Sequence, residues 1–391
     1  MPQGPEPGGA RAAMMRRRRI VAGAGAAVVV VAAAVTAGVV MTGDDPSGKP
    51  DKKAGPAPSS WVQQAARQLT ARPGLQYAGT LPADGRPVQA RLRVTRAGSA
   101  TGTLTAAGGM RADVVTADGV TYLKAGPAFW RTYGGEGARP DVYAGRWTKA
   151  PASMPGLDVA DVLGPEKIAE RLAKAPARPR TENVAGVPAY RVKTQDADYF
   201  LTTAAPYRLV SVQAAGQGDP RFAVAPVTAA APLFAELRPR VAALGGAADP
   251  ALRFAPGKLT FVNCDENMNG CTVSVPAKMT APDGTVPSGA RAALRATVTS
   301  KGKALGTCTG TGAVPSNREL VLRCTVTGRT WRNWMRQALD SPGAHPYEAQ
   351  ARVVGEAVSA ADVSGLLAGI DRERGVAKGA GGKNAPGAPK P

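Results

Sequence analysis

The feature that most constrains this chain is an uncharged run of 23 residues, Ile20 to Thr42, which directly follows four arginines, Arg16, Arg17, Arg18 and Arg19. At ~1.5 Å per residue, a helix of this length reaches ~34 Å and crosses a ~30 Å hydrocarbon core. Arginines beside a span stay in the cytoplasm. The sequence therefore predicts a single-pass cell-membrane protein with a cytoplasmic basic tail at 1–19, a transmembrane helix at 20–42, and extracytoplasmic globular domains.

A cleaved signal peptide is the alternative to this anchor, because Val35-Thr36-Ala37 is an acceptable small-residue cleavage site. The run is longer than the ~7–15 apolar residues of a typical signal peptide, which favours the anchor. No cysteine precedes Cys264, so the chain lacks the acylated cysteine of a lipoprotein.

The rest of the chain divides by composition. Residues 43–58 form a Pro/Gly-rich linker, and residues 374–391 are predicted to be a disordered basic tail, because neither segment has enough apolar residues to bury. A Gly- and Ala-rich segment, 245–250, separates a cysteine-free region at 59–245 from a region at 255–373 that holds all four cysteines. We therefore expect two extracytoplasmic domains.

The first domain shows both helical and strand periodicity. Trp61, Ala65 and Leu69 share one helical face. From Val88 to Thr95 apolar and polar residues alternate, and Asp118-Gly119 is a strong hairpin signal. Short strands on both sides of a helical stretch predict an α+β fold with an antiparallel sheet.

Three segments carry a family resemblance: Thr116 to Ala125 with Phe129-Trp130, then Arg146-Trp147-Thr148-Lys149, then Val184 to Tyr190. Over about residues 60–212 the chain resembles the actinobacterial LolA/LppX-type lipoproteins. The resemblance implies an antiparallel β half-barrel with covering helices and an apolar cavity that holds a lipid or acyl ligand. Tyr122, Phe129, Trp130 and Trp147 are the candidate cavity residues, with packing in an ordinary core as the alternative.

The second domain has the short strands and turns of an all-β, immunoglobulin-like sandwich, with added helices. Four cysteines outside the cytoplasm predict disulfides. Cys264 and Cys271 bracket a six-residue loop, and Cys308 and Cys324 are equidistant from a turn at about Ser316. We therefore predict the pairs Cys264–Cys271 and Cys308–Cys324, in the second case across a hairpin, with cross-pairing between sheets left open.

The loop between Cys264 and Cys271 also matches the start of a calcium loop, with Asp265, Asn267 and Asn269 at alternate positions before Gly270. The residue that should be a bidentate glutamate is Pro276, so ordinary turn chemistry is the stronger interpretation. A zinc site is disfavoured because no CxxC spacing occurs.

The sequence predicts no enzyme and no cofactor, because its one histidine, His345, has no nucleophile motif beside it. The net charge of +20 includes +4 in the cytoplasmic tail, from five Arg against Glu6, and leaves +16 elsewhere. Outside the cytoplasm this charge points to an anionic envelope surface and not to nucleic acid. We expect a membrane-anchored envelope protein that binds an apolar ligand. The alternative is a sensor, regulator or structural interaction protein without a bound ligand, whose protein partner the sequence does not identify.

Overall fold

The computed structural model describes residues 60–382 apart from 84, 136–138, 152–153, 155–156, 176–178, 216–217 and 342. The predicted cytoplasmic tail, transmembrane helix and linker lie outside the described residues. Among the helices that are described, none is both long and apolar enough to cross a membrane.

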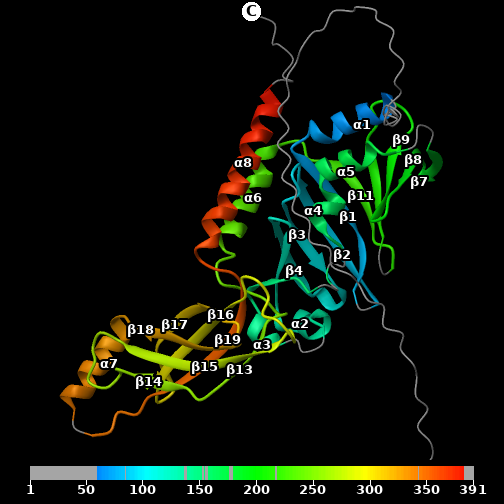
Figure 1. The fold of residues 1–391 in the computed structure, drawn as a ribbon. Coiled ribbons are helices and arrows are strands. Elements are labelled where there is room, and N and C mark those ends of the chain that lie inside the picture. Colours follow the sequence, from blue (N-terminus) through cyan, green and yellow to red (C-terminus); the bar gives the residue numbers. More distant parts are fainter. Residues whose placement is uncertain are drawn as a thin grey trace, which may run out of the picture. The chain divides into compact units, whose positions relative to one another are not determined.

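The fold is α+β, with more strands than helices (Figure 1). The helices are α1 (Ser60–Thr70), α2 (Pro127–Tyr133), α3 (Pro140–Tyr143), α4 (Val159–Leu163), α5 (Pro165–Leu172), α6 (Ala230–Ala242), α7 (Arg329–Asp340) and α8 (Asp362–Gly382), with one 3-10 turn at Ala107–Gly109. The first strands are β1 (Gly74–Ala83), β2 (Arg86–Thr95), β3 (Ala100–Thr105), β4 (Arg111–Ala117), β5 (Val120–Ala125), β6 (Trp147–Lys149), β7 (Arg180–Val184), β8 (Val187–Lys193), β9 (Ala197–Thr202), β10 (Leu209–Ala214) and β11 (Arg221–Pro226). The later strands are β12 (Ala247–Ala248), β13 (Arg253–Pro256), β14 (Thr260–Val262), β15 (Cys271–Ala281), β16 (Arg291–Ser300), β17 (Lys303–Ala313), β18 (Glu319–Val326) and β19 (Glu348–Val358).

The predicted helix and meander of the first region are confirmed. Trp61, Ala65 and Leu69 are buried on α1, and β2 to β5 pair in sequence as antiparallel neighbours. The turn before β5 has the positive φ angles of a tight hairpin, 50° at Asp118 and 72° at Gly119. Local periodicity was sufficient to predict these strands, because each of them pairs with the next one along the chain.

Helices cover both faces of this part of the sheet. Val114 belongs to the same buried cluster as α1, α4 and α5, whereas its neighbour Val115 belongs to a cluster with α6 and α8. Successive side chains of a strand point to opposite faces, so the two groups of helices lie on opposite sides of β4. α6 and α8 lie alongside each other (Figure 1).

The segment predicted to separate the two regions contributes a strand to the sheet. Residues 247–248 form β12, which pairs with β19 on one side and with β6 on the other. One continuous 15-stranded sheet therefore runs from β17 to β7 through both regions. Alanine and glycine suggested a break in the sequence, but pairing with β19 and β6 places Ala247 and Ala248 in the sheet despite the low strand propensity of alanine.

The second region has two sheets. β16, β17 and β19 end the long sheet, and β13, β14, β15 and β18 form a separate one. Leu294 and Val298 of β16 share a buried cluster with Val275 of β15 and Leu322 of β18, so the two sheets enclose one core.

The predicted hairpin that would place Cys308 and Cys324 opposite each other about a turn at Ser316 is wrong. β17 pairs with β16, and β18 pairs with β15, so the two strands belong to different sheets. The symmetric spacing of Cys308 and Cys324 about a turn is equally compatible with a chain that crosses from one sheet to the other. Glycines at 306, 310 and 312 alternate with the exposed residues of β17 and allow close approach to β18.

The predicted disordered tail also needs correction at its start. α8 continues to Gly382, and the tail assigned to 374–391 therefore begins within a helix. Ala377 is 9% exposed and packs in the cluster that contains Phe234 of α6. A neighbouring helix thus provides apolar contacts that the sequence composition of the tail did not indicate. Residues 383–391 lie outside the described part.

Candidate functional site

The four predicted cavity aromatics divide between two buried clusters. Tyr122 and Trp147 pack with α6 and α8, whereas Phe129 and Trp130 of α2 belong to the larger core on the other face of the sheet. All four side chains are buried. They therefore do not line one common cavity, which corrects the prediction that treated them as a set. Tyr122 and Trp147 lie on the paired strands β5 and β6, whereas Phe129 and Trp130 lie on α2, which packs in the core on the other face of the sheet.

Tyr122 lines a pocket of about 570 Å³ beside the start of α8. Burial raises the pKa of its hydroxyl to about 12, and the nearby carboxylates of Asp249 and Asp118 contribute in the same direction. A phenol with so high a pKa stays neutral at physiological pH, so Tyr122 can donate a hydrogen bond but cannot supply a negative charge.

α2 and α3 assemble an aromatic cluster around Phe129 and Trp130. The ring of Phe129 lies 5.1 Å from that of Tyr133, and the ring of Trp130 lies 5.6 Å from that of Tyr143. Trp130 and Tyr133 are each 1% exposed. Sequence reasoning missed Tyr133, although its position four residues after Phe129 places both on one face of a helix.

Two polar atoms in this cluster have no hydrogen-bond partner within the described structure: Nε1 of Trp130 and the hydroxyl oxygen of Tyr133. Buried donors are almost always satisfied, because leaving one unpaired costs about 1–3 kcal/mol. Trp130 and Tyr133 are thus buried donors of one aromatic cluster for which the described structure offers no acceptor.

Other buried tyrosines of the same core are satisfied. The hydroxyl of Tyr77 donates to the carbonyl oxygen of Leu163 at 2.6 Å, and that of Tyr199 donates to the carbonyl oxygen of Val162 at 3.0 Å. Burial raises the pKa of Tyr77 well above its ordinary value. The end of α4 thus serves as acceptor for two phenols, and Tyr133 differs from both.

A second pocket, of about 600 Å³, lies between α8 and the β2–β3 hairpin. Glu373 of α8 accepts hydrogen bonds from the hydroxyls of Thr95, at 2.5 Å, and Ser99, at 2.6 Å. Burial raises the pKa of Glu373 above its usual value despite these two donors. This carboxyl holds the last helix against the first region and was not found from the sequence, because its partners are more than 270 residues away.

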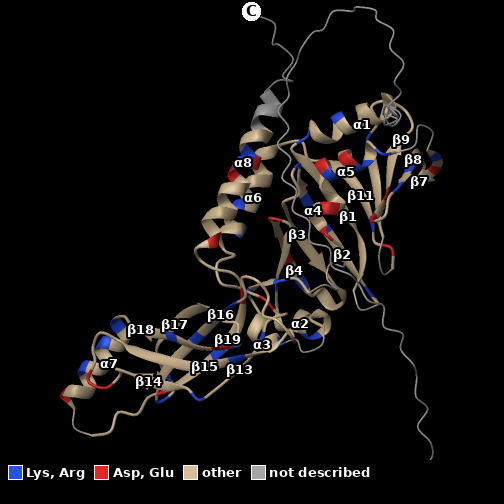
Figure 2. Ribbon diagram, viewed as in Figure 1, with Lys and Arg blue, Asp and Glu red and all other residues tan. Residues whose placement is uncertain are grey.

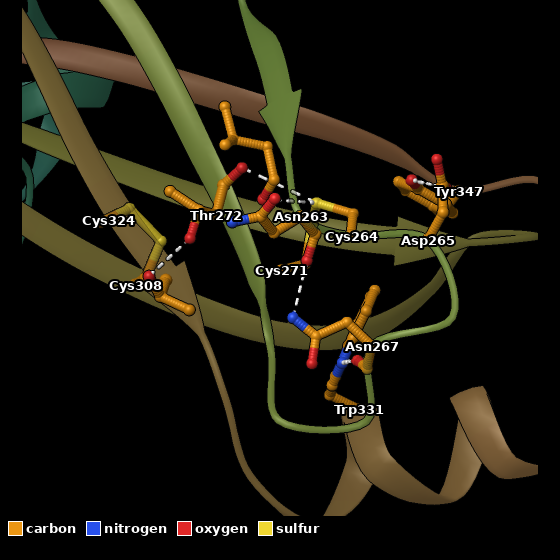
Figure 3. The surroundings of a disulfide bond; sticks show 12 residues. Asn263, Cys264, Asp265, Asn267, Cys271, Thr272, Cys308, Cys324, Trp331 and Tyr347 are labelled. Carbon is orange, nitrogen blue, oxygen red and sulfur yellow. Dashed lines mark hydrogen bonds between the residues drawn. A yellow bond between two sulfur atoms is a disulfide. The ribbon is translucent and has the colours of Figure 1, made fainter.

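Both disulfides are present in the structure, and their pairing is Cys264–Cys271 and Cys308–Cys324. Around the first, the loop bonds to its own neighbours (Figure 3). Asp265 accepts a hydrogen bond from the hydroxyl of Tyr347 at 2.8 Å, and the side-chain oxygen of Asn267 accepts one from the backbone of Asn269 at 3.0 Å.

These hydrogen bonds show that the residues of the calcium-like motif stabilise the turn between Cys264 and Cys271. Asn267 also donates to the carbonyl oxygen of Asn263 at 2.8 Å, and its own carbonyl oxygen accepts from the indole of Trp331 at 2.9 Å. Asn and Asp side chains commonly stabilise turns in this way. His345, the one histidine, has its Nε2 3.1 Å from the carbonyl oxygen of Ser341 in a separate turn.

Comparison with known proteins identifies no family. No protein-family model matches the chain, and no curated protein matches it. Among solved structures, the chain is similar to the MucA/MucB complex of Pseudomonas aeruginosa, with 12% identity over 70% of this chain and 94% of that chain and a TM-score of 0.23. A structure of MucB with periplasmic MucA gives 12% identity, coverage of 70% and 94%, and a TM-score of 0.22; MucB alone gives 13%, 68%, 92% and 0.24. TM-scores this low do not establish a common fold.

Proposed function

We propose that this chain is a non-enzymatic, extracytoplasmic cell-envelope protein, anchored by residues 20–42, that binds a lipid or another apolar ligand in its first domain. In this proposal the first domain is a LolA/LppX-like half-barrel, and the second is an immunoglobulin-like sandwich. The two disulfides support an extracytoplasmic location, because such bonds persist mainly in oxidising compartments.

The observation that carries ligand binding is the pair of unsatisfied donors at Trp130 and Tyr133. Sites for apolar ligands are mostly apolar, with a few polar groups that orient the ligand. The aromatic cluster has this character, because two hydrogen-bond donors lie among buried rings. An acyl ester or acid supplies both the apolar chain and the carbonyl acceptors that such a site needs.

Native mass spectrometry of the full-length chain tests the proposal. The protein is purified from bacterial membranes in a mild detergent, and co-purifying molecules are identified after dissociation. We expect an acyl ligand in stoichiometric amount. We expect Tyr133→Phe, which removes one ligand hydrogen bond, to weaken ligand binding roughly 2- to 10-fold. Tyr207→Phe is the matched control, because the Tyr207 ring is half-exposed.

Stability measurements on the same variants distinguish a bound ligand from an empty core. In delipidated protein, Tyr133→Phe removes an unsatisfied buried hydroxyl, so the free energy of unfolding should rise by about 1–3 kcal/mol. In loaded protein this gain should disappear. An equal gain in both preparations, with no acyl ligand in the native spectrum, would contradict ligand binding and favour a structural or regulatory protein.

A further inference from the structure

A basic groove of about 730 Å³ is lined by residues of both regions. It extends over β16, β17 and β19 and is bounded by Arg146 and by residues 245–246. Figure 2 marks the charged residues along these strands. Arg146, Arg295 and Arg352 contribute the positive charge, and Thr307, Thr309 and Thr311 of β17 add hydroxyl groups along one side.

Strand register places two of these arginines directly opposite each other. Arg295 of β16 pairs with Arg352 of β19 in an antiparallel ladder, and Thr309 is the partner of Arg295 on the other side. Side chains at such positions have Cβ atoms ~4.5–5.5 Å apart, and like charges there are destabilising. This arrangement therefore lowers stability unless another interaction offsets the like charges.

Within the described part of the chain, backbone carbonyl groups and not carboxylates bond to two of these arginines. Arg295 donates to the carbonyl oxygen of Gly246 at 2.7 Å, and Arg352 donates to the carbonyl oxygen of Asp141 at 3.0 Å. None of the ion pairs among the described residues involves Arg146, Arg295 or Arg352. These backbone carbonyls orient the guanidinium groups without neutralising them.

One acidic residue lines the groove, but it is already paired. Glu356 lies 3.0 Å from Arg291, and its side chain is 2% exposed. The Nε atom of Arg295 is shielded from solvent and has no hydrogen-bond partner within the described structure. Burial and the neighbouring charge of Arg352 lower the pKa of Arg146. The groove therefore keeps three positive charges close together, with one donor unsatisfied.

We propose that this groove binds a phosphate-type anion, held by Arg146, Arg295 and Arg352 with the threonine hydroxyls of β17 as further donors. Guanidinium groups suit this chemistry because their planar fork donates two parallel hydrogen bonds to phosphate oxygens. The groove is separate from the aromatic cluster at Trp130, so the inference does not depend on lipid binding there. A free phosphate and a phospholipid headgroup share the chemistry that the groove recognises.

The test is a thermal-unfolding titration of the full-length chain, solubilised in a non-ionic detergent, with inorganic phosphate at constant ionic strength. A ligand that binds only the folded state raises the Tm progressively with its concentration. We expect this rise in the parent protein. Arg146→Gln and Arg352→Gln should each weaken phosphate binding about 10-fold or more, since each removes a charge-assisted hydrogen bond.

Arg323→Gln is the matched control, because Arg323 is an exposed arginine of β18, outside the groove, and its loss lowers the net charge by the same amount. It should respond to phosphate like the parent. Without phosphate, Arg352→Gln should raise the Tm by removing the like-charge pair, whereas with saturating phosphate its Tm should fall below that of the parent. If Arg352 had only a structural role, phosphate would not reverse which of the two proteins, Arg352→Gln or the parent, has the higher Tm.

Dihexanoyl phosphatidylglycerol, added as a soluble short-chain lipid, distinguishes the two sources. A Tm rise with phosphate alone supports a small soluble anion, and a rise with both supports a headgroup phosphodiester. Dihexanoyl phosphatidylcholine controls for acyl-chain effects. Equal phosphate-dependent shifts in the parent, Arg146→Gln and Arg352→Gln would overturn the proposal, as would the absence of any shift in the parent.

Discussion

The Cys308–Cys324 disulfide joins the two sheets of the second region, because Cys308 lies on β17 and Cys324 on β18. Replacement of both cysteines by alanine removes this link while keeping the strands. Alanine is the appropriate substitute because Gly306, Gly310 and Gly312 leave little space on this face of β17. The loss of stability should then report the effect of the covalent connection.

The expected magnitude follows from the length of chain that each disulfide closes. The sequence separation is 16 residues for Cys308–Cys324 and 7 for Cys264–Cys271. In the chain-entropy treatment these closures contribute about 3.1 and about 2.4 kcal/mol. Cys308→Ala/Cys324→Ala should therefore lower the free energy of unfolding by about 3 kcal/mol, slightly more than Cys264→Ala/Cys271→Ala.

Urea unfolding of the full-length chain in detergent measures both losses. Limited reduction followed by thiol alkylation and peptide mapping gives a second, independent readout. Cys308 is half-exposed, whereas Cys264 and Cys271 are 3% and 0% exposed, so a mild reductant should open Cys308–Cys324 first. A stability loss below ~1 kcal/mol for the Cys308/Cys324 variant, or earlier reduction of Cys264–Cys271, would refute this reasoning.

Three further substitutions test other contacts by urea or thermal unfolding. Arg291→Met leaves the buried carboxylate of Glu356 unpaired and should cost about 3–5 kcal/mol, whereas a near-neutral result would show that the pair is solvated. Gly310→Ala would place a Cβ atom 1.9 Å from the carbonyl oxygen of Arg323, so we expect a loss of about 1–3 kcal/mol and no loss if β18 can move away. Burial raises the pKa of Glu373, so the folded state binds the carboxyl proton more tightly than the unfolded state does. The contribution of Glu373 to stability therefore falls as the pH rises above 4.5, the ordinary pKa of this side chain. Glu373→Gln should remove that fall, and identical pH–Tm profiles for variant and parent would contradict it.

The sequence was most informative where pairing is local. The hairpin at Asp118-Gly119 and the helix at Trp61 depend on residues a few positions apart, so periodicity and turn chemistry predict them. β11 gave no comparable signal, because it ends at a proline and because one of its partners, β1, lies much earlier in the chain. The same limit explains the hairpin error, since symmetric spacing about a turn does not identify the sheet to which each strand belongs.

For the candidate site, the sequence supplied residue types but not their surroundings. Trp130 was selected because aromatic residues commonly line apolar sites, and Tyr133 could have been added from helical spacing. The missing hydrogen bonds could not have been inferred. Tyr77 and Tyr199 find acceptors 86 and 37 residues away, and only the folded chain shows that Tyr133 finds none among its described neighbours.

The surroundings of the groove arginines contrast with those of one half-buried arginine in the first region. Arg191, on β8, lies 2.7 Å from Glu182 and 2.5 Å from Asp198, so it has two carboxylate partners. Carboxylates are thus available in this protein and are used where a partner is needed on the strand surface. At Arg295 and Arg352, two cations face each other across a ladder with backbone carbonyls as their acceptors. Net charge alone could not distinguish these two environments. A ligand that supplies the missing negative charge accounts for the difference, and the inversion of Tm order with and without phosphate is the consequence that a purely structural arginine pair would not show.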